Sequence, residues 1–427
     1  MQRILYSVIF YFAVPLIILR LLLRSIKAPA YRRRIAERFA WFELPAGFEA
    51  SKQTIWIHAV SVGEVMATGA LIRQLQQRYA NAQIIVTTMT PTGSDRVKDL
   101  FGEAVYHSYI PYDLPGATNR FINKVNPSLL ILMETELWPN LVYCCHRRGV
   151  KLILANARLS EKSARSYARF SKFTRAMLSQ IDCIAAQAQA DARRFIELGA
   201  DDKKVTVTGS LKFNIEIDQS EPPSSSVFSS INESGRTVWI AASTREGEES
   251  KVLSAFQQVL QSDPSILLLL VPRHPERFDK VARLCTEKGF NIGRRSLNQS
   301  FGESTQVYLG DSMGEMQSYY RLANIAFVGG SLVDTGCQNV LEPAALGIPV
   351  IVGPSQFNFA TICLQLEQAG ALRTVRNEDE LASLVIELSR DRAQQQSMGA
   401  SGKELVKANQ NALPALMLQI EKFVVNK

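Results

Sequence analysis

Residues 324–354 read NIAFVGGSLVDTGCQNVLEPAALGIPVIVGP and decide the fold of their half of the chain. A short β-rich apolar run opens the segment and stops at Gly329-Gly330, and a second apolar run closes it. Between the two runs, the spacing predicts a short helix over residues 339–346, with Gly347 at the position where a glycine ends a helix. Strand, turn, helix and strand form a βαβ unit, which implies a parallel sheet.

A ligand site in this unit would lie where the first strand ends and the helix begins. Glycines let a backbone approach a phosphate closely, and free N–H groups at a helix start favour an anion. Glu342 in the first helical turn can accept hydrogen bonds from ribose hydroxyls. The alternative is an ordinary crossover without a ligand, and spacing alone leaves both open. The lack of a Walker lysine and of a G-x-G-x-x-G pattern in this segment argues against ATPases and dinucleotide-binding enzymes.

Strand and helix patterns alternate on both sides of a polar stretch, which predicts two α/β domains joined by a linker. The 427 residues suffice for two full cores. Residues 35–215 form the first domain, 216–235 the linker, and 236–427 the second domain, which ends in helices. A cleft between two such domains is the usual place for a ligand. Predicted strands cover residues 54–60, 84–89, 105–111, 129–133, 152–155, 183–186 and 205–208, then 238–241, 266–271, 307–309, 325–328 and 350–352.

The sequence pattern of residues 1–34 predicts a membrane anchor. Residues 4–19 are apolar or aromatic apart from Ser7, and no small-residue cleavage site follows, which argues against a signal peptide. Positive charge after the apolar run places the rest of the chain in the cytoplasm and favours anionic lipid over nucleic acid as its partner. The length leaves open whether the segment spans the bilayer or lies in its interface. The basic residues are Arg20, Arg24, Lys27, Arg32, Arg33, Arg34 and Arg38.

The composition is that of a globular α/β protein, with 46% hydrophobic and 21% charged residues and a net charge of +8. The six cysteines show no metal-ligand spacing, and with four histidines and no H-E-x-x-H pattern a catalytic metal has little support. We therefore expect reduced, mostly buried thiols in a cytoplasmic compartment.

Charged side chains follow several predicted strands. Glu64 ends the motif HAVSVGE, and Glu134 and Glu136 belong to METELWPN. A carboxylate at a helix start is held ionised by the helix dipole, so other surroundings must raise its pKa if it is to act as a base. Taken singly, each of these carboxylates could be a helix cap. His58, in the same motif as Glu64, is expected to be a hydrogen-bonded strand residue and not a catalyst.

Two cations also follow strands: Lys212 in GSLKFN and Arg273 in PRHPER. On opposite sides of a cleft they would suit a doubly anionic ligand, and arginine adds bidentate recognition of phosphate or carboxylate. Each alone could be a solvated loop charge. Their coincidence at successive strand ends favours a functional site.

Together, HAVSVGE, METELWPN, NARLS, GSLKFN, PRHPER and VGGSLV with QNVLEPAALGIPVIVGP resemble the 3-deoxy-D-manno-octulosonic acid (Kdo) transferases, membrane-associated glycosyltransferases of the lipopolysaccharide pathway. The resemblance runs over the whole chain. It implies an α/β GT-B fold, in which two Rossmann-like domains face a cleft, with the acceptor on the first and the nucleotide sugar on the second. It also implies inverting transfer from CMP-Kdo to a lipid A precursor, lipid IVA, at the cytoplasmic side of the inner membrane, without metal or cofactor.

The resemblance assigns roles to residues of this chain. Glu64 is expected as the catalytic base, and Glu134 and Lys212 as groups that stabilise the transition state. The residues expected to bind CMP are Pro272, Arg273, Met313, Gly314, Glu315, Asn339, Val340, Leu341 and Glu342. The family often has Gly-Gly-His-Asn where this chain has Gly-Cys-Gln-Asn. Because Gln338 cannot become cationic, its side chain is not expected to neutralise phosphate charge.

Two alternatives remain. Another GT-B enzyme that uses a UDP-sugar, either a transferase or a 2-epimerase, shares the second-domain pattern but does not explain the basic segment beside the apolar one. A non-enzymatic membrane-surface scaffold on the same fold predicts loss of the charged residues at the strand ends, yet these residues are present.

Overall fold

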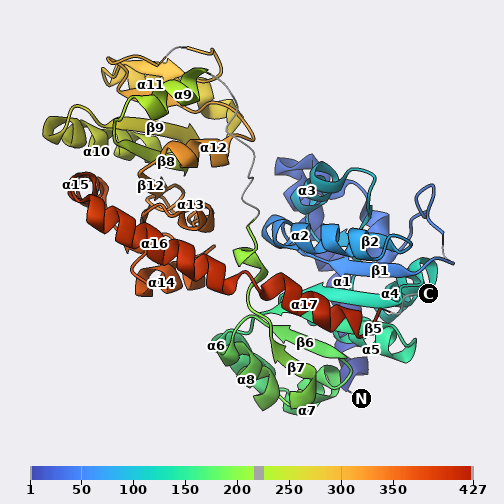
Figure 1. The fold of residues 1–427 in the computed structure, drawn as a ribbon. Helices are drawn as coiled ribbons and strands as arrows, with labels where there is room; N and C mark the ends of the chain where they lie inside the picture. Colours follow the sequence, from blue (N-terminus) through green and yellow to red (C-terminus); the bar gives the residue numbers. More distant parts are fainter. Residues whose placement is uncertain (1, 50, 216–225, 300, 425–427) are drawn as a thin grey trace. The chain divides into compact units, whose positions relative to one another are not determined.

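The computed structural model describes residues 2–49, 51–215, 226–299 and 301–424, which form two compact α/β units (Figure 1). The first unit holds the chain up to Asn214 together with the segment from Asn409 onward, and the second holds Ile215–Ala408. Each unit is built around one seven-stranded parallel sheet.

The sheet of the first unit has the strand order β3-β2-β1-β4-β5-β6-β7. Strand order reverses between β1 and β4, which pair in parallel, and this reversal point is where open α/β sheets bind ligands. Side chains alternate between two cores: Ile55 and Ile57 of β1 face one, and Trp56 faces the other. The strands are β1 Thr54–His58, β2 Gln83–Thr88, β3 Tyr106–Tyr109, β4 Leu129–Met133, β5 Lys151–Ala157, β6 Cys183–Ala186 and β7 Val205–Val207.

Helices cover the first sheet because apolar residues line one side of each. The α-helices are α1 Gln2–Lys27, α2 Val62–Arg78, α3 Pro91–Phe101, α4 Pro115–Val125, α5 Pro139–Arg147, α6 Glu161–Ala168, α7 Ser171–Leu178, α8 Gln189–Glu197 and α17 Ala412–Glu421. Short 3₁₀ turns are η1 Pro29–Arg32, η2 Ile35–Phe39, η3 Asp202–Lys204 and η4 Leu211–Phe213.

The sheet of the second unit has the order β10-β11-β9-β8-β12-β13-β14 and reverses between β8 and β12. Its strands are β8 Val238–Thr244, β9 Leu267–Pro272, β10 Ile292–Arg294, β11 Val307–Leu309, β12 Ile325–Val328, β13 Val350–Val352 and β14 Leu372–Thr374. Its helices are α9 Ser226–Glu233, α10 Glu248–Ser262, η5 Pro275–Arg277, α11 Phe278–Glu287, α12 Met316–Leu322, α13 Leu341–Leu346, α14 Ala360–Gln368, α15 Glu378–Arg390 and α16 Arg392–Asn409. The predicted βαβ unit is therefore β12, α13 and β13, and Gly347 ends α13 with a φ of +80°.

Every strand predicted from the sequence is present, but two expectations about the domains need correction. Part of the expected linker, residues 226–233, is helix α9, whose Val227, Phe228 and Ile231 are buried in the second unit; residues 216–225 lie outside the described part of the chain. The last helix, α17, belongs to the first unit, because Leu416 and its apolar neighbours are buried in that unit's core.

Helix α1 is long and apolar enough to cross a membrane, and it packs lengthwise on the first unit. The guanidinium of Arg3 and the hydroxyl of Ser7 donate to Oδ1 of Asn140 at 2.9 and 3.1 Å. Phe10, Val14 and Ile17 pack against a cluster formed by Leu21, Tyr112, Leu114 and Ala117. The opposite side of α1 is apolar and exposed, which favours insertion of that side into a membrane.

The basic residues in the last turns of α1 and just after it divide into two groups. Arg38 is 2% exposed and donates to the carbonyl of Met89 at 2.9 Å, and Arg34 donates to the hydroxyl of Ser94 at 3.0 Å. Both arginines therefore fasten the segment to the domain, whereas Arg20, Arg24, Arg32 and Arg33 are exposed.

We expect Phe12→Lys combined with Leu16→Lys to release the protein from membranes without unfolding it. These side chains are 79% and 68% exposed, so the packed side of α1 is untouched. Losing the burial of two such side chains should lower the partition coefficient on anionic vesicles by at least about 100-fold, measured by sedimentation. Ile196→Lys with Leu418→Lys, on α8 and α17, is the matched control. Unchanged sedimentation of the α1 variant would assign anchoring to another surface.

Candidate active site

Glu64 lies in the first turn of α2, directly after β1. Ser61 caps this helix, its hydroxyl donates to Oε1 of Glu64 at 3.2 Å, and the Val60 N–H donates to Oε2 at 2.8 Å. The Glu64 side chain is nevertheless buried, and burial raises its pKa to about 7, an effect reinforced by the charges of Glu134 and Glu136 and opposed by the Val60 and Ser61 bonds. The surroundings thus restore the basicity that a helix start removes.

Glu134 follows β4, the strand beside β1, and has a left-handed backbone with a φ of +55°. Such a conformation costs a non-glycine residue about 1–3 kcal/mol, and it clusters at functional sites. The Glu134 N–H donates to Ala155 at 2.9 Å, which holds the turn on the sheet. Burial also raises the pKa of Glu136, whose carboxylate accepts a bond from the Trp138 indole at 2.9 Å.

Lys212 lies in η4, a turn that contacts α2 within the first unit. Asn156 fixes this turn: its Oδ1 accepts a bond from the Leu211 N–H at 3.0 Å. Asn156 sits in a bulge of β5 with a φ of +52°, and its Nδ2 is buried without a hydrogen-bond partner in the described structure. The structure therefore brings Glu64 and Glu134 together and places the Lys212 turn beside the helix of Glu64.

His58 has no catalytic geometry. Its ring is fully buried, Nδ1 lies 3.0 Å from the carbonyl oxygen of Thr87, and burial lowers its pKa to about 4. A hydrogen-bonded strand residue was the expectation, and it is confirmed.

In the second unit, the residues expected to bind a nucleotide lie at the carboxyl ends of β9, β11 and β12. Pro272 ends β9 and Arg273 is exposed beyond it. Burial raises the pKa of Glu342, while a 2.9 Å hydrogen bond from Asn339 and the nearby charge of Arg273 lower it. Arg273 therefore lies near Glu342. Val340 and Leu341 are fully buried, so only their backbone can reach a ligand.

The segment from Met313 to Glu315 precedes α12, which contacts α13. Gly314 has a φ of +84°, and Met313 is 59% exposed. The Glu315 carboxylate is already bound by a fork from Arg295 at 2.8 and 3.0 Å. Burial raises the pKa of Glu315, but the Arg295 pair and the Ser312 hydroxyl outweigh it and lower the net value. This segment can thus offer a ligand its backbone more readily than its carboxylate.

The N–H groups of the turn after β12 are bonded within the protein and are not free to bind an anion. The buried carboxylate of Glu248 accepts hydrogen bonds from the N–H groups of Gly330, Ser331 and Leu332 at 2.6, 3.0 and 2.9 Å. A side chain at Gly330 would collide with the Gly336 carbonyl, since its Cβ would lie 2.4 Å away. The glycines therefore serve close packing of the turn.

Arg245, also near this edge, escaped the sequence analysis. Arg245 contacts the ring of His274 through its guanidinium, and burial together with the nearby charge of Arg273 lowers the pKa of Arg245. Only the excess of cations in PRHPER signalled a basic site here. The Gln338 side chain donates weakly to the Gly336 carbonyl at 3.4 Å, and the Cys337 thiol is buried 3.8 Å from that of Cys363.

These groups can support one kind of chemistry. A carboxylate with a pKa near neutrality can accept a proton from a hydroxyl, and a nearby lysine can stabilise negative charge. An arginine beside a carboxylate can bind a phosphate and a ribose. Together they suit transfer of a sugar from a nucleotide to a hydroxyl group.

Comparisons with known proteins agree with this chemistry. The family described as 3-deoxy-D-manno-octulosonic-acid transferase (kdotransferase) matches residues 33–215, and the glycosyl transferases group 1 match residues 246–405. The chain is 43% identical to 3-deoxy-D-manno-octulosonic acid transferase of Haemophilus influenzae over 425 residues, which covers 99% of each chain.

Solved structures identify the fold but not the activity. A glycosyltransferase from Rickettsia africae is 13% identical, with a TM-score of 0.55 over 88% of this chain and 100% of that one. A UDP-GlcNAc 2-epimerase from Neisseria meningitidis is 12% identical, with a TM-score of 0.58 over 87% and 100%. Because a transferase and an epimerase match equally well, only the full-length sequence match decides between them. The chain therefore belongs to the 3-deoxy-D-manno-octulosonic acid transferases, glycosyltransferases with a GT-B fold.

Proposed function

We propose that this Kdo transferase moves Kdo from CMP-Kdo to a hydroxyl group of a lipid A precursor, lipid IVA, with inversion at the anomeric carbon and with Glu64 as general base. The observation that carries the proposal is the raised pKa of Glu64, about 7, beside the carboxylates that follow β4. A base titrating near the working pH combines a large ionised fraction with adequate proton affinity. Glu134 and Lys212 complete the acceptor side as groups that stabilise the transition state.

The donor belongs to the second unit in this proposal. Arg273 binds the phosphate of CMP, Glu342 accepts hydrogen bonds from its ribose, and Asn339 orients Glu342. The rest of the CMP site is formed by Pro272, by the segment from Met313 to Glu315, and by the backbone of Val340 and Leu341. The cations of the chain supply the positive charge that the leaving phosphate needs, so the proposal requires neither a metal ion nor a cofactor.

The proposed location is the cytoplasmic side of the inner membrane. The apolar exposed side of α1 inserts into the lipid, and the exposed arginines after it bind anionic headgroups.

Mass spectrometry of the products tests the reaction. Full-length protein in detergent micelles, incubated with CMP-Kdo and lipid IVA, should yield acceptor carrying added Kdo together with free CMP, and UDP-N-acetylglucosamine should yield no product. NMR of the new linkage should show the inverted anomeric configuration. Retention of the anomeric configuration would contradict a single displacement with Glu64 as base. Transfer from the UDP-sugar alone would contradict the assignment of CMP-Kdo as the donor.

We expect Arg273→Ala to weaken CMP binding by about 1.5–3 kcal/mol, because it removes a hydrogen bond between two charged groups. Calorimetric titration with CMP measures the change. Arg373→Ala, which removes an exposed arginine paired with Glu387, is the control and should leave the affinity unchanged. Glu342→Ala should also weaken binding through loss of the ribose contact. Wild-type affinity in both site variants would place the nucleotide elsewhere.

A further inference from the structure

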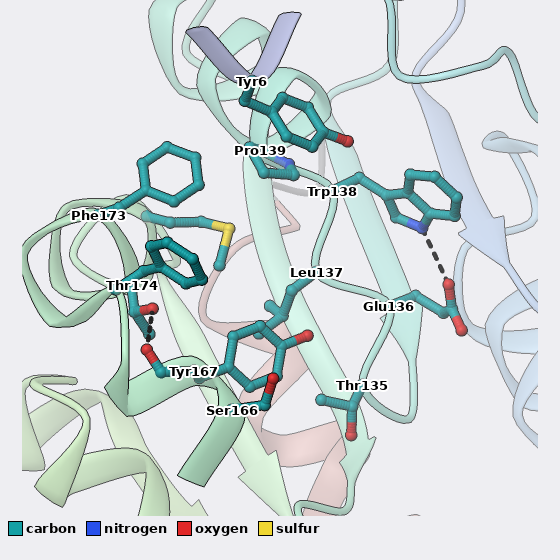
Figure 2. A pocket seen from close by; sticks show the side chains of 12 residues that line it. Tyr6, Thr135, Glu136, Leu137, Trp138, Pro139, Ser166, Tyr167, Phe173 and Thr174 are labelled. Atoms are coloured by element: carbon teal, nitrogen blue, oxygen red, sulfur yellow. Dashed lines mark hydrogen bonds between the residues drawn. The ribbon is translucent and has the colours of Figure 1, made fainter. Parts of the chain in front are cut away.

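A cavity of about 380 Å³ lies within the first unit, and Glu136, two residues after Glu134, is part of its lining (Figure 2). This volume falls within the range of small-molecule sites, roughly 300–1,000 Å³. Helix α1, the loop between β4 and α5, and helices α6 and α7 contribute its lining. Its lining residues are Tyr6, Thr135, Glu136, Leu137, Trp138, Pro139, Ser166, Tyr167, Phe170, Phe173, Thr174 and Met177.

The lining presents mainly hydrocarbon and aromatic surface to an occupant. Aromatic rings come from α1, from the loop after β4 and from the α6–α7 segment, as Figure 2 shows. Several polar groups of the lining are already bonded within the protein. The Glu136 carboxylate accepts from Trp138 at 2.9 Å, the Thr174 hydroxyl donates to the Tyr167 carbonyl at 2.9 Å, and the Thr135 hydroxyl donates to the Arg158 carbonyl. An apolar occupant would therefore leave these bonds intact.

The cavity connects two functional parts of the unit. Glu136 of the lining follows Glu134 by two residues, and its charge acts on the pKa of Glu64. Tyr6 of the lining belongs to α1, whose outward side chains are apolar and exposed. An occupant would thus contact both the anchor helix and the loop that carries Glu134.

The edge of the cavity carries positive charge. Phe170 lines the cavity and is 64% exposed, and Arg169 and Lys172 on either side of it are exposed. An apolar cavity with exposed cations at its edge is complementary to an acyl chain attached to a phosphorylated headgroup.

We propose that this cavity binds one acyl chain of the lipid acceptor and so positions the acceptor hydroxyl at Glu64. The inference rests on the proposed function and adds a subsite to it. The acceptor is favoured over a bulk phospholipid because the loop after β4, which carries Glu134, also lines the cavity through Glu136.

A bulky substitution at the edge tests the subsite. Ser166→Trp places an indole in the cavity from an exposed position on α6, and Ala168→Trp places the same group on the same helix outside the cavity. For each full-length variant, KM is measured with tetraacylated lipid IVA and with its fully deacylated headgroup. The ratio compared is the KM for lipid IVA divided by the KM for the deacylated headgroup. If the indole excludes only two methylene groups of the acyl chain from the cavity, this ratio should rise about tenfold in Ser166→Trp. The ratio in Ala168→Trp should equal that of the wild type.

A binding measurement separates this inference from the proposed reaction. Lipid IVA with brominated acyl chains should quench Trp138 fluorescence, isolated as the difference between wild type and Trp138→Phe. Quenching without sugar transfer would contradict the proposed reaction and support the subsite. Transfer without quenching, or an unchanged KM ratio in Ser166→Trp, would overturn the subsite. Equal quenching by a brominated phospholipid would overturn its assignment to the acceptor.

Discussion

Glu64→Gln should reduce the turnover number by about 10²–10⁴, the usual contribution of general-base catalysis. The amide keeps the size of the side chain and one acceptor oxygen, but it cannot take the proton of the acceptor hydroxyl. CMP affinity should equal that of the wild type, because Arg273 and Glu342 belong to the other unit. Initial rates with saturating CMP-Kdo and calorimetric titration with CMP measure the two quantities. Normal turnover in this variant would leave Glu64 as a helix cap.

Thermal stability provides the control for Glu64→Gln. Because the folded protein raises the pKa of Glu64 from its ordinary value of 4.5 to about 7, its ionised form is disfavoured in the folded state. The stabilising contribution of this group is complete below its unfolded pKa and is lost as the pH rises through about 7. Glutamine does not titrate, so the Tm of the variant relative to wild type should increase from pH 5 to pH 8. A loss of both turnover and stability at pH 8 would contradict this account of the site.

Glu248→Gln should have the largest effect on stability. Oε1 of Glu248 accepts from Ser331 and Leu332, and Oε2 accepts from Gly330 and Arg245 at 2.6 and 3.1 Å. An amide has one acceptor oxygen, so two buried N–H groups lose their partner at about 1–3 kcal/mol each, or roughly 2–6 kcal/mol together. Urea denaturation of the full-length protein, followed by Trp239 fluorescence, measures this loss in the second unit.

Glu246→Gln is the matched control for Glu248→Gln. Glu246 lies two residues earlier, is exposed, and pairs only with the exposed Lys280 among the described residues. Its replacement should leave the denaturation midpoint unchanged. CMP affinity should fall in Glu248→Gln, because the turn that it fixes leads to Asn339. Equal midpoints for the two variants would show that the Glu248 bonds contribute nothing to stability.

The sequence predicted the central strands well because parallel strands buried on both faces form continuous apolar runs. The edge strands β10 and β14 were missed, since Ile292–Arg294 and Leu372–Thr374 each contain an arginine and little apolar sequence. Edge strands tolerate such residues because one side of the backbone faces solvent. Helix α17 was predicted as a helix, but its packing on the first unit depends on contacts with residues far away in the sequence.

Site residues could likewise be predicted where they follow a strand that the sequence pattern locates, and not elsewhere. Glu64 and Arg273 follow strands that the pattern located, so their positions at sheet edges could be inferred. Glu248 could not be inferred, because nothing in the local sequence distinguishes this buried carboxylate from the exposed Glu246. The acyl-chain cavity likewise combines four separate segments, of which only METELWPN stood out in the sequence.

The pH dependence of kcat/KM, compared between wild type and Glu64→Gln, tests the central claim most directly. In the wild type, log(kcat/KM) should rise with unit slope and level off near pH 7, where the buried carboxylate titrates. Both proteins share the titrating groups of CMP-Kdo and the lipid phosphates, so any difference between the profiles belongs to Glu64. The account predicts that the residual activity of Glu64→Gln lacks this rise. A rise of the same slope and midpoint in both proteins would contradict the assignment of Glu64 as the base.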